Sequence, residues 1–576
     1  MKFSTRLILC ILIMNPLAEL GAQIIIPVGY FSSPLGINLA ETGSFAEVRA
    51  NHFHSGIDFS IQQKEGLPVF AAADGVISRI KVSPVGFGNA LYIDHPNGFT
   101  SVYAHMKGYN DTISEYLHAN QYKNKSFEVD LFPENMKDFI YVKKGDVIGY
   151  AGNSGSSGGA HLHFELRDTK TENIINPQLF GFNITDNIPP YIDFIKIYPE
   201  DKDNFFASAN NEAVRFEVKK MAGGEYRLSP KDTIEVWGNF SVGVQAFDFN
   251  QNKSDRNGFY SLNMFADNVS FYSMSCDSFA FAESRFVNAS IDYAANYNHG
   301  YRILKSKRLP GNKISFIKSD SLNGLLNFTD ERIHEMQITV ADLAGNKTNL
   351  LFWVKSEKPQ VLVQVPLIQE DSVFLLKYDR INKFETSEVK VDFPLGSLYE
   401  DMNFKYRKSA GSKGMFSAIH YLHDAEVPIH NRIRVSVKAT DLPQRLRSKA
   451  LLVRIDRDGK RNPAGGSYEN GYIITTANIF DGYAIVIDTV APSIKSWPEN
   501  NKSKTSLKFT VSDNFSGIST YRAEVDGKWA LVEWDPKNKL MVYHFDQVAV
   551  PGKNTFKLFL EDEKGNKSSY SITFTR

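Results

Sequence analysis

The sequence predicts a mainly β protein, in which an N-terminal antiparallel β-sheet domain is followed by several β-sandwich modules. Short alternating runs such as "LPVFAAADGVISRIKV" are broken by Gly, Pro and Asn, a pattern typical of strands joined by tight turns. A weak repeat of Asp and Asn turns recurs after residue 186. The chain has 576 residues, too many for one hydrophobic core, so we expect several domains.

Residues 1–22 are predicted to be a signal peptide. Lys2 and Arg6 precede an apolar run that is too short to span a bilayer as a permanent helix, and small residues follow it. We therefore expect an exported protein, in the periplasm or outside the cell, with no transmembrane anchor. Of the two cysteines only Cys276 remains after cleavage, so no intrachain disulfide is expected.

The charge balance argues against a polyanionic partner. The chain has 65 basic and 65 acidic residues, and neither sign forms a long run. Such a surface has no electrostatic footprint for nucleic acid or for an anionic membrane.

Residues 24–185 are predicted to form the first β domain, with "HPNG" and "KKGD" as turns between strands. Residues 108–141 depart from this rhythm, because they are polar, long and partly helical in pattern. Long insertions of this kind often carry function. We expect this insertion to be a lid or a wall beside a substrate site.

The later chain is divided into predicted β modules at 186–258, 259–358, 359–487 and 488–576. The last resembles the immunoglobulin-like modules of bacterial exported proteins, on the evidence of its linker and turn motifs. In the repeated turns an Asn follows an Asp by four residues, and such side chains cap turns, although a calcium site is an alternative. The pairs are Asp248 with Asn252, Asp342 with Asn346, and Asp562 with Asn566.

Seven of the thirteen histidines precede residue 186, and two of them lie in "HLHFEL". If this segment is a strand, His161, His163 and Glu165 share one face and the apolar residues share the other. The polar face is then free for chemistry, with Glu165 orienting an imidazole; a buried strand with hydrogen-bonded histidines is the alternative.

His54 and Asp58, in "HFHSGIDF", form a second candidate pair. A fully extended strand would separate them by about 13 Å, so both can contact one ion only if the chain bends at Ser55 and Gly56. Two surface polar residues are the alternative interpretation.

The motifs "HFHSGIDF", "PVFAAADGVI", "GFGNALYIDHPNGFTSVYAHM" and "VKKGDVIGYAGNSGSSGGAHLHFEL" occur in this order between residues 49 and 177. This segment resembles the lysostaphin-type, or LytM-like, zinc metallopeptidases that cut peptidoglycan peptides. The resemblance implies one Zn²⁺ per chain held by His54, Asp58 and His163, with His105 and His161 as the catalytic pair. The insertion after Met106 departs from the family pattern.

The resulting prediction is an exported zinc metalloendopeptidase that hydrolyses peptidoglycan stem peptides or cross-bridges. Two nitrogen ligands and one oxygen ligand leave one tetrahedral position for an activated water, and His105 and His161 would move protons. His52 and His95 are expected to be structural. Two alternatives are a non-catalytic wall-binding regulator of other hydrolases, and an adhesin whose modules after residue 186 bind a cell-envelope protein.

Overall fold

The computed structural model describes residues 25–134, 138–200, 205–206, 212–222, 224–249, 255–358, 373–501 and 503–576. The predicted signal peptide and Asn252 lie outside these ranges. In the part of the chain that the structure describes, β-strands dominate, as predicted, and no helix has the length and apolar character needed to cross a membrane. Cys276 is buried and unpaired.

The N-terminal domain is an antiparallel sheet whose apolar side packs into its own core. In spatial order its main strands are β1 (Glu41–Gly43), β4 (Ile57–Ser60), β12 (His161–Asp168), β8 (Phe99–Tyr109), β7 (Asn89–Asp94), β6 (Gly75–Val82) and β10 (Tyr141–Val142). Shorter elements are β2 (Val48–Arg49), β3 (His52–Phe53), β5 (Pro68–Phe70), β9 (Val129–Leu131), β11 (Val147–Ala151), β13 (Ile174–Ile175) and the 3-10 helix η1 (Pro177–Phe180).

Strand β12 has the two-faced character that its sequence predicts. Leu162, Phe164 and Leu166 are fully buried in the domain core, because alternate side chains of a strand point to one side of the sheet. His161 and His163 therefore lie on the opposite side.

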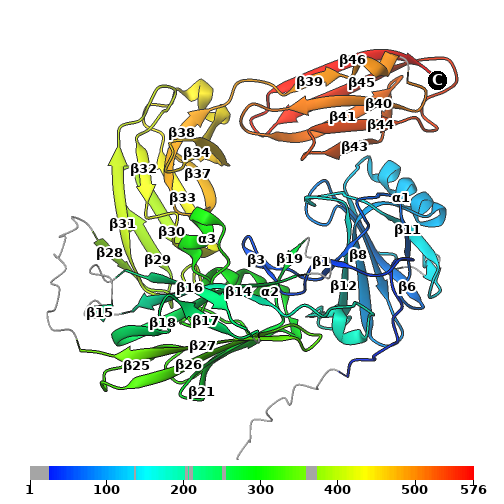
Figure 1. The fold of residues 1–576 in the computed structure, drawn as a ribbon. Coiled ribbons are helices and arrows are strands. Elements are labelled where there is room, and N and C mark those ends of the chain that lie inside the picture. Colours follow the sequence, from blue (N-terminus) through cyan, green and yellow to red (C-terminus); the bar gives the residue numbers. More distant parts are fainter. Residues whose placement is uncertain are drawn as a thin grey trace, which may run out of the picture.

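The insertion contains helix α1 (Asp111–Asn124), in agreement with its partly helical pattern. Asn110 caps the helix by accepting the Ile113 N–H, the usual role of an Asn at this position. Figure 1 shows α1 beside the last module of the chain. There Tyr122 packs edge-on against Trp529, with ring centroids 5.0 Å apart.

Residues 191–356 form one large sheet around one hydrophobic core. Strands from the predicted modules 186–258 and 259–358 share this sheet and this core. The strands of this sheet are β14 (Tyr191–Pro199), β15 (Phe205–Phe206), β16 (Val214–Lys220), β17 (Tyr226–Ser229), β18 (Thr233–Phe249), β19 (Arg256–Asn257), β20 (Ser261–Ala266), β21 (Val269–Ser275), β23 (Leu304–Lys305), β24 (Ile317–Ser319), β25 (Leu326–Phe328), β26 (Ile333–Ala341) and β27 (Lys347–Ser356). Strand β22 (Ser278–Phe279) pairs instead with β13 of the N-terminal domain. The short helices of this region are α2 (Phe281–Ser284), η2 (Arg285–Ala289) and α3 (Tyr293–His299).

Residues 373–487 form two sheets that enclose a third core. One sheet has β28 (Val373–Leu376), β31 (Met402–Ser409), β32 (Ile419–Leu422), β38 (Gly482–Ile487), β34 (Ala450–Ile455) and β35 (Arg461–Gly465). The other has β29 (Asn382–Glu385), β30 (Val389–Phe393), β33 (Pro428–Lys438), β37 (Tyr472–Ile479) and β36 (Ser467–Glu469), and η3 (Gln444–Lys449) precedes β34.

The last module is a sandwich of two four-stranded sheets with its own core. One sheet has β39 (Ser493–Ser496), β40 (Ser506–Ser512), β44 (Leu540–His544) and β43 (Val532–Asp535), with η4 (Pro498–Asn501) between β39 and β40. The other has β42 (Lys528–Ala530), β41 (Ile518–Val525), β45 (Lys553–Asp562) and β46 (Lys567–Thr575). The chain curves so that this module returns to the N-terminal domain (Figure 1).

Candidate functional site

Three neighbouring strands bring the predicted site residues together. β12 lies between β4 and β8, and His163 is the cross-strand partner of Asp58 on one side and of Ala104 on the other. Directly opposed side chains in a sheet lie about 5 Å apart at Cβ. The sheet register therefore places Asp58 and His163 in contact, with His105 one residue beyond.

The bend predicted between His54 and Asp58 is present. β3 ends at Phe53 and β4 begins at Ile57, so the intervening residues are outside both strands. A Cβ atom on Gly56 would lie 2.4 Å from the Phe164 carbonyl oxygen, which only glycine avoids. The bend brings His54 Nε2 to 3.1 Å from Asp58 Oδ1.

Three potential metal-ligand atoms converge in this buried space: Nε2 of His54, Oδ1 of Asp58 and Nδ1 of His163. His54 Nε2 lies 3.0 Å from His163 Nδ1, which in turn lies 2.9 Å from Asp58 Oδ1. The structure thus brings together the three residues that the resemblance assigns to zinc.

The outer nitrogen of each ligand imidazole has an acceptor of its own. His54 Nδ1 lies 2.8 Å from the Ser44 carbonyl oxygen, and His163 Nε2 lies 3.0 Å from Glu165 Oε1. Both outer nitrogens must donate, so in the neutral rings both inner nitrogens present lone pairs toward a carboxylate oxygen. Such a set of facing acceptors suits a cation, and these residues fit a zinc ion.

Two arginines complete the polar shell. Arg49 Nη2 donates to Asp58 Oδ2 at 2.6 Å, and Arg167 Nε donates to Glu165 Oε2 at 2.7 Å. Neither arginine is among the site residues predicted from the sequence. The position of Arg167 two residues after Glu165, on the same strand face, is the one local signal that could have indicated it.

The electrostatics of the cluster favour an ionised Asp58. Burial alone would raise the pKa of Asp58, but the charge of His54 and hydrogen bonds from His161 and His163 hold it well below its usual range. Burial opposes the charge on His163 as well, yet its contacts with Asp58 and Glu165 raise its pKa to about 9. A proton on His163 and a metal ion would therefore compete for the same nitrogen.

His161 and His105 lie beside the three ligand atoms. His161 Nδ1 donates to the Gly159 carbonyl oxygen at 2.9 Å, and His161 Nε2 lies 3.3 Å from Asp58 Oδ1. His105 Nδ1 donates to the Ser154 carbonyl oxygen at 2.9 Å. The centroids of the two rings lie 4.8 Å apart.

The backbone at His105 is in the left-handed region, with φ of 58°, in the middle of β8. The pairing register between β7 and β8 shifts at this point, as in a β-bulge. Strained backbone of this kind is concentrated at functional sites. Burial and the neighbouring imidazoles lower the pKa of His105 to about 3, so the ring is neutral at neutral pH.

The two histidines predicted to be structural do not join the cluster. His95 is buried with both ring nitrogens hydrogen bonded, to the Asp74 carbonyl oxygen and the Ser101 hydroxyl. His52 is exposed on β3.

The loop that carries Asn153 and Ser154 connects the site to the last module. Lys537 Nζ donates to Asn153 Oδ1 at 3.1 Å and to the Ser157 carbonyl oxygen at 3.1 Å. A cavity of about 330 Å³ lies between this loop, helix α1 and residues 531–542. The insertion therefore borders a cavity next to the site, together with a module distant in sequence.

Comparison with known families matches residues 52–177 to peptidase family M23 and residues 374–488 to the Zu5-like domain. The "DD-carboxypeptidase/endopeptidase Mpg" of Neisseria meningitidis is 33% identical over 153 residues, which cover 26% of this chain and 28% of that protein. The lysostaphin of Staphylococcus simulans is 30% identical over 137 residues, which cover 24% of this chain and 20% of that protein.

Among solved structures, the catalytic domain of lysostaphin from Staphylococcus simulans aligns with 25% identity and a TM-score of 0.18, covering 24% of this chain and 87% of that one. The chain spans under a third of the length of the curated relatives reported above.

Proposed function

We propose that this chain, whose residues 52–177 form a peptidase family M23 domain, is an exported zinc endopeptidase that cleaves peptide cross-links of peptidoglycan. The observation that carries the proposal is the convergence of two imidazole nitrogens and one carboxylate oxygen with two further imidazoles beside them. A closed structural zinc site uses four protein ligands, whereas a catalytic site leaves a position open. His54, Asp58 and His163 would be the ligands.

A zinc ion held by these residues would polarise a carbonyl group and lower the pKa of water. Proton transfer would be carried out by side chains of the protein. His105 and His161 each have Nδ1 fixed by a backbone carbonyl, so each ring keeps one orientation and presents Nε2 to the substrate. At Nε2 they would take a proton from the attacking water and return one to the leaving amine.

Arg49 and Glu165 act as positioning residues in this proposal. Arg49 occupies Asp58 Oδ2 and leaves Oδ1 to face the metal, while Glu165 fixes the tautomer of His163. Contacts of this kind orient metal ligands and raise their basicity.

The substrate and the compartment rest on the resemblance to wall-cutting peptidases and on the predicted signal peptide, so periplasm and extracellular space both fit. The insertion helix and the last module border the cavity beside the Asn153 loop, which supports a role for both as walls of a substrate groove. A non-catalytic regulator on the same scaffold would not need His105 and His161 in addition to three ligands.

The proposal is tested by incubating the full zinc-loaded chain with purified sacculi of different cross-link types and measuring the masses of the released peptides. New amine and carboxyl ends within the peptides are expected, and they should disappear after zinc removal and return when zinc is restored. Binding to sacculi without any release by the zinc-loaded protein would instead favour the regulator.

A further inference from the structure

A second group of possible ligands lies at the junction of the N-terminal domain and the large sheet. Asp186, Asp248 and Asp342, here called the junction cluster, each offer an oxygen within 4.8 Å of the other two. Asp186 is in the linker before β14, Asp248 is near the end of β18, and Asp342 follows β26. Asp248 and Asp342 are buried.

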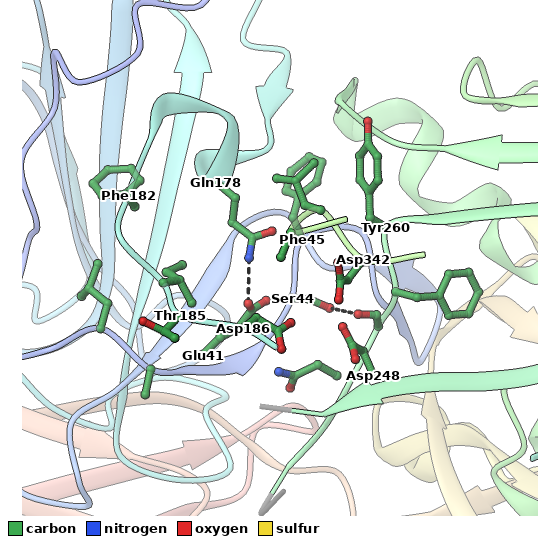
Figure 2. Close-up of a pocket in the computed structure, with 18 of the residues that line it drawn as sticks. Glu41, Ser44, Phe45, Gln178, Phe182, Thr185, Asp186, Asp248, Tyr260 and Asp342 are labelled. Carbon is green, nitrogen blue, oxygen red and sulfur yellow. Dashed lines mark hydrogen bonds between the residues drawn. The ribbon is translucent and has the colours of Figure 1, made fainter. Parts of the chain in front are cut away.

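The junction cluster lines a cavity of about 510 Å³ to which both domains contribute. Glu41, from β1 of the N-terminal domain, lies beside the aspartates and accepts a hydrogen bond of 2.9 Å from Gln178 Nε2. Figure 2 shows Glu41 and the three aspartates gathered around the same space. The cavity thus joins the two domains through acidic side chains.

The charged side chains among the described residues that line this cavity are all acidic. No lysine or arginine is among the described residues that line the cavity. Buried carboxylates without a positive partner are costly unless an ion compensates them.

An amide oxygen in the same cavity also favours a bound cation. Asn257 of β19 is the cross-strand partner of Asp248, so the two side chains share one face of the sheet. Asn257 is 6% exposed and lines the cavity, and its Oδ1 has no hydrogen-bond partner in the described structure. An unpaired buried acceptor beside carboxylates is the arrangement that a cation satisfies.

We propose that the junction cluster and Asn257 bind one calcium ion, which clamps the N-terminal domain to the large sheet. Oxygen atoms that share a calcium ion lie about 2.4 Å from it, so they can be up to about 4.8 Å apart. The four proposed ligands all offer oxygen, and they come from the linker, β18, β19 and the turn after β26. Calcium accepts flexible sets of oxygen ligands, whereas magnesium demands near-ideal octahedral geometry.

The chain contains a similar cluster that serves as a matched control. Asp488, Asp513 and Asp562 of the last module also lie within 4.8 Å of one another. Lys449 lies near this second cluster: its Nζ donates to Asn566 Oδ1 at 2.7 Å, and the Asn566 amide donates to Asp562 Oδ2. The described residues that line the junction cavity include no lysine or arginine.

The test uses the full chain, loaded with zinc and freed of calcium, in calorimetric titrations with calcium chloride and in thermal unfolding. The wild type is expected to bind calcium at the junction, with a rise in Tm of about 3 °C or more at saturating calcium. Asp248→Asn should lose that site and the rise. Without calcium its Tm should stay close to that of the wild type, because the amide has the size and shape of the carboxyl group. Asp513→Asn should respond as the wild type does.

Asn257→Ala provides a second variant that leaves all carboxylates in place, and it should bind calcium about tenfold more weakly. Undiminished calcium binding by Asp248→Asn would overturn the proposal. Loss of the response in Asp513→Asn alone would also overturn it, by assigning the ion to the last module. An equal rise with magnesium chloride would overturn the choice of calcium.

Discussion

His163 and His334 are both buried imidazoles held between two carboxylates, yet they belong to very different surroundings. At His163, Nδ1 lies 2.9 Å from Asp58 and Nε2 lies 3.0 Å from Glu165. The same Nδ1 lies 3.0 Å from His54 Nε2, so a third acceptor enters the space. The carboxylate oxygen is therefore shared among several rings.

His334, on β26, has a separate partner for each nitrogen. Its Nδ1 lies 2.7 Å from Asp267, its Nε2 lies 3.0 Å from Asp330, and its ring stacks on Phe328 with centroids 3.7 Å apart. No second imidazole contacts either carboxylate in the hydrogen bonds and ion pairs described for these residues. Both histidines thus have carboxylate neighbours, but only at His163 do nitrogen and oxygen atoms from several segments converge, as the proposed zinc site requires.

The comparison would break if the two aspartates that lie beside an imidazole Nδ1, Asp58 and Asp267, were equivalent. Asp58→Asn removes a charged ligand and should cost most of the zinc affinity and all measurable cleavage. Asp267→Asn keeps the hydrogen-bonding shape next to His334 and should change neither. Zinc analysis and peptide release for both variants check this, and equal zinc content in the two would contradict the comparison.

Substitution of His105 tests whether the proposed catalytic role can be separated from metal binding. His105→Ala leaves the three ligand residues in place, so zinc content should stay near one equivalent while turnover falls by about a hundredfold or more. The exposed His52, changed to Ala, is the matched control and should keep full turnover. A His105→Ala protein as active as the wild type would remove His105 from the proposed pair.

Substitution of Glu165 tests whether hydrogen bonds to the proposed metal ligands contribute to zinc affinity. Glu165→Gln keeps the size of the side chain but weakens the acceptor for His163 Nε2, so zinc affinity should fall by about 10- to 100-fold. Competition with a zinc chelator measures the change. An unaltered zinc affinity would mean that Glu165 only balances the charge of Arg167.

A smaller effect is expected from His420, a buried histidine of the 373–487 region. Burial lowers the pKa of His420 to about 4, below the value of about 6.5 expected in the unfolded chain. The unfolded chain then gains the proton first, so stability is full above about pH 6.5 and declines as the pH falls toward 4. His420→Gln should flatten this decline by roughly 1 to 2 kcal/mol at pH 5, measured by denaturant unfolding.

Local pattern was enough to predict the strand with His161 and His163, because alternation along one strand assigns its faces. The bend at Gly56 was predicted on the condition that His54 and Asp58 contact the same ion, since an extended chain cannot bring both to it. The left-handed backbone of His105 could not be foreseen, because it results from a register shift against β7.

Contacts between distant segments also could not be predicted from the sequence. The turn-capping roles of Asp342 and Asp562 were predicted and are confirmed, since each accepts the backbone N–H of the Asn four residues on. Their grouping with aspartates far along the chain depends on how linker and strands pack. The shared core of residues 191–356 also depends on packing between distant segments. Pairing between β14 and β18 and between β20 and β26 unites the two predicted modules.

The most direct test of the central claim is zinc analysis of His161→Ala and His163→Ala beside the wild type, with peptide release from sacculi measured on the same samples. The account predicts that His163→Ala is poor in zinc and inactive, whereas His161→Ala keeps about one zinc per chain and is slowed by about a hundredfold or more. Loss of zinc from His161→Ala with retention in His163→Ala would reverse the two roles. Full zinc and full activity in both variants would contradict the account.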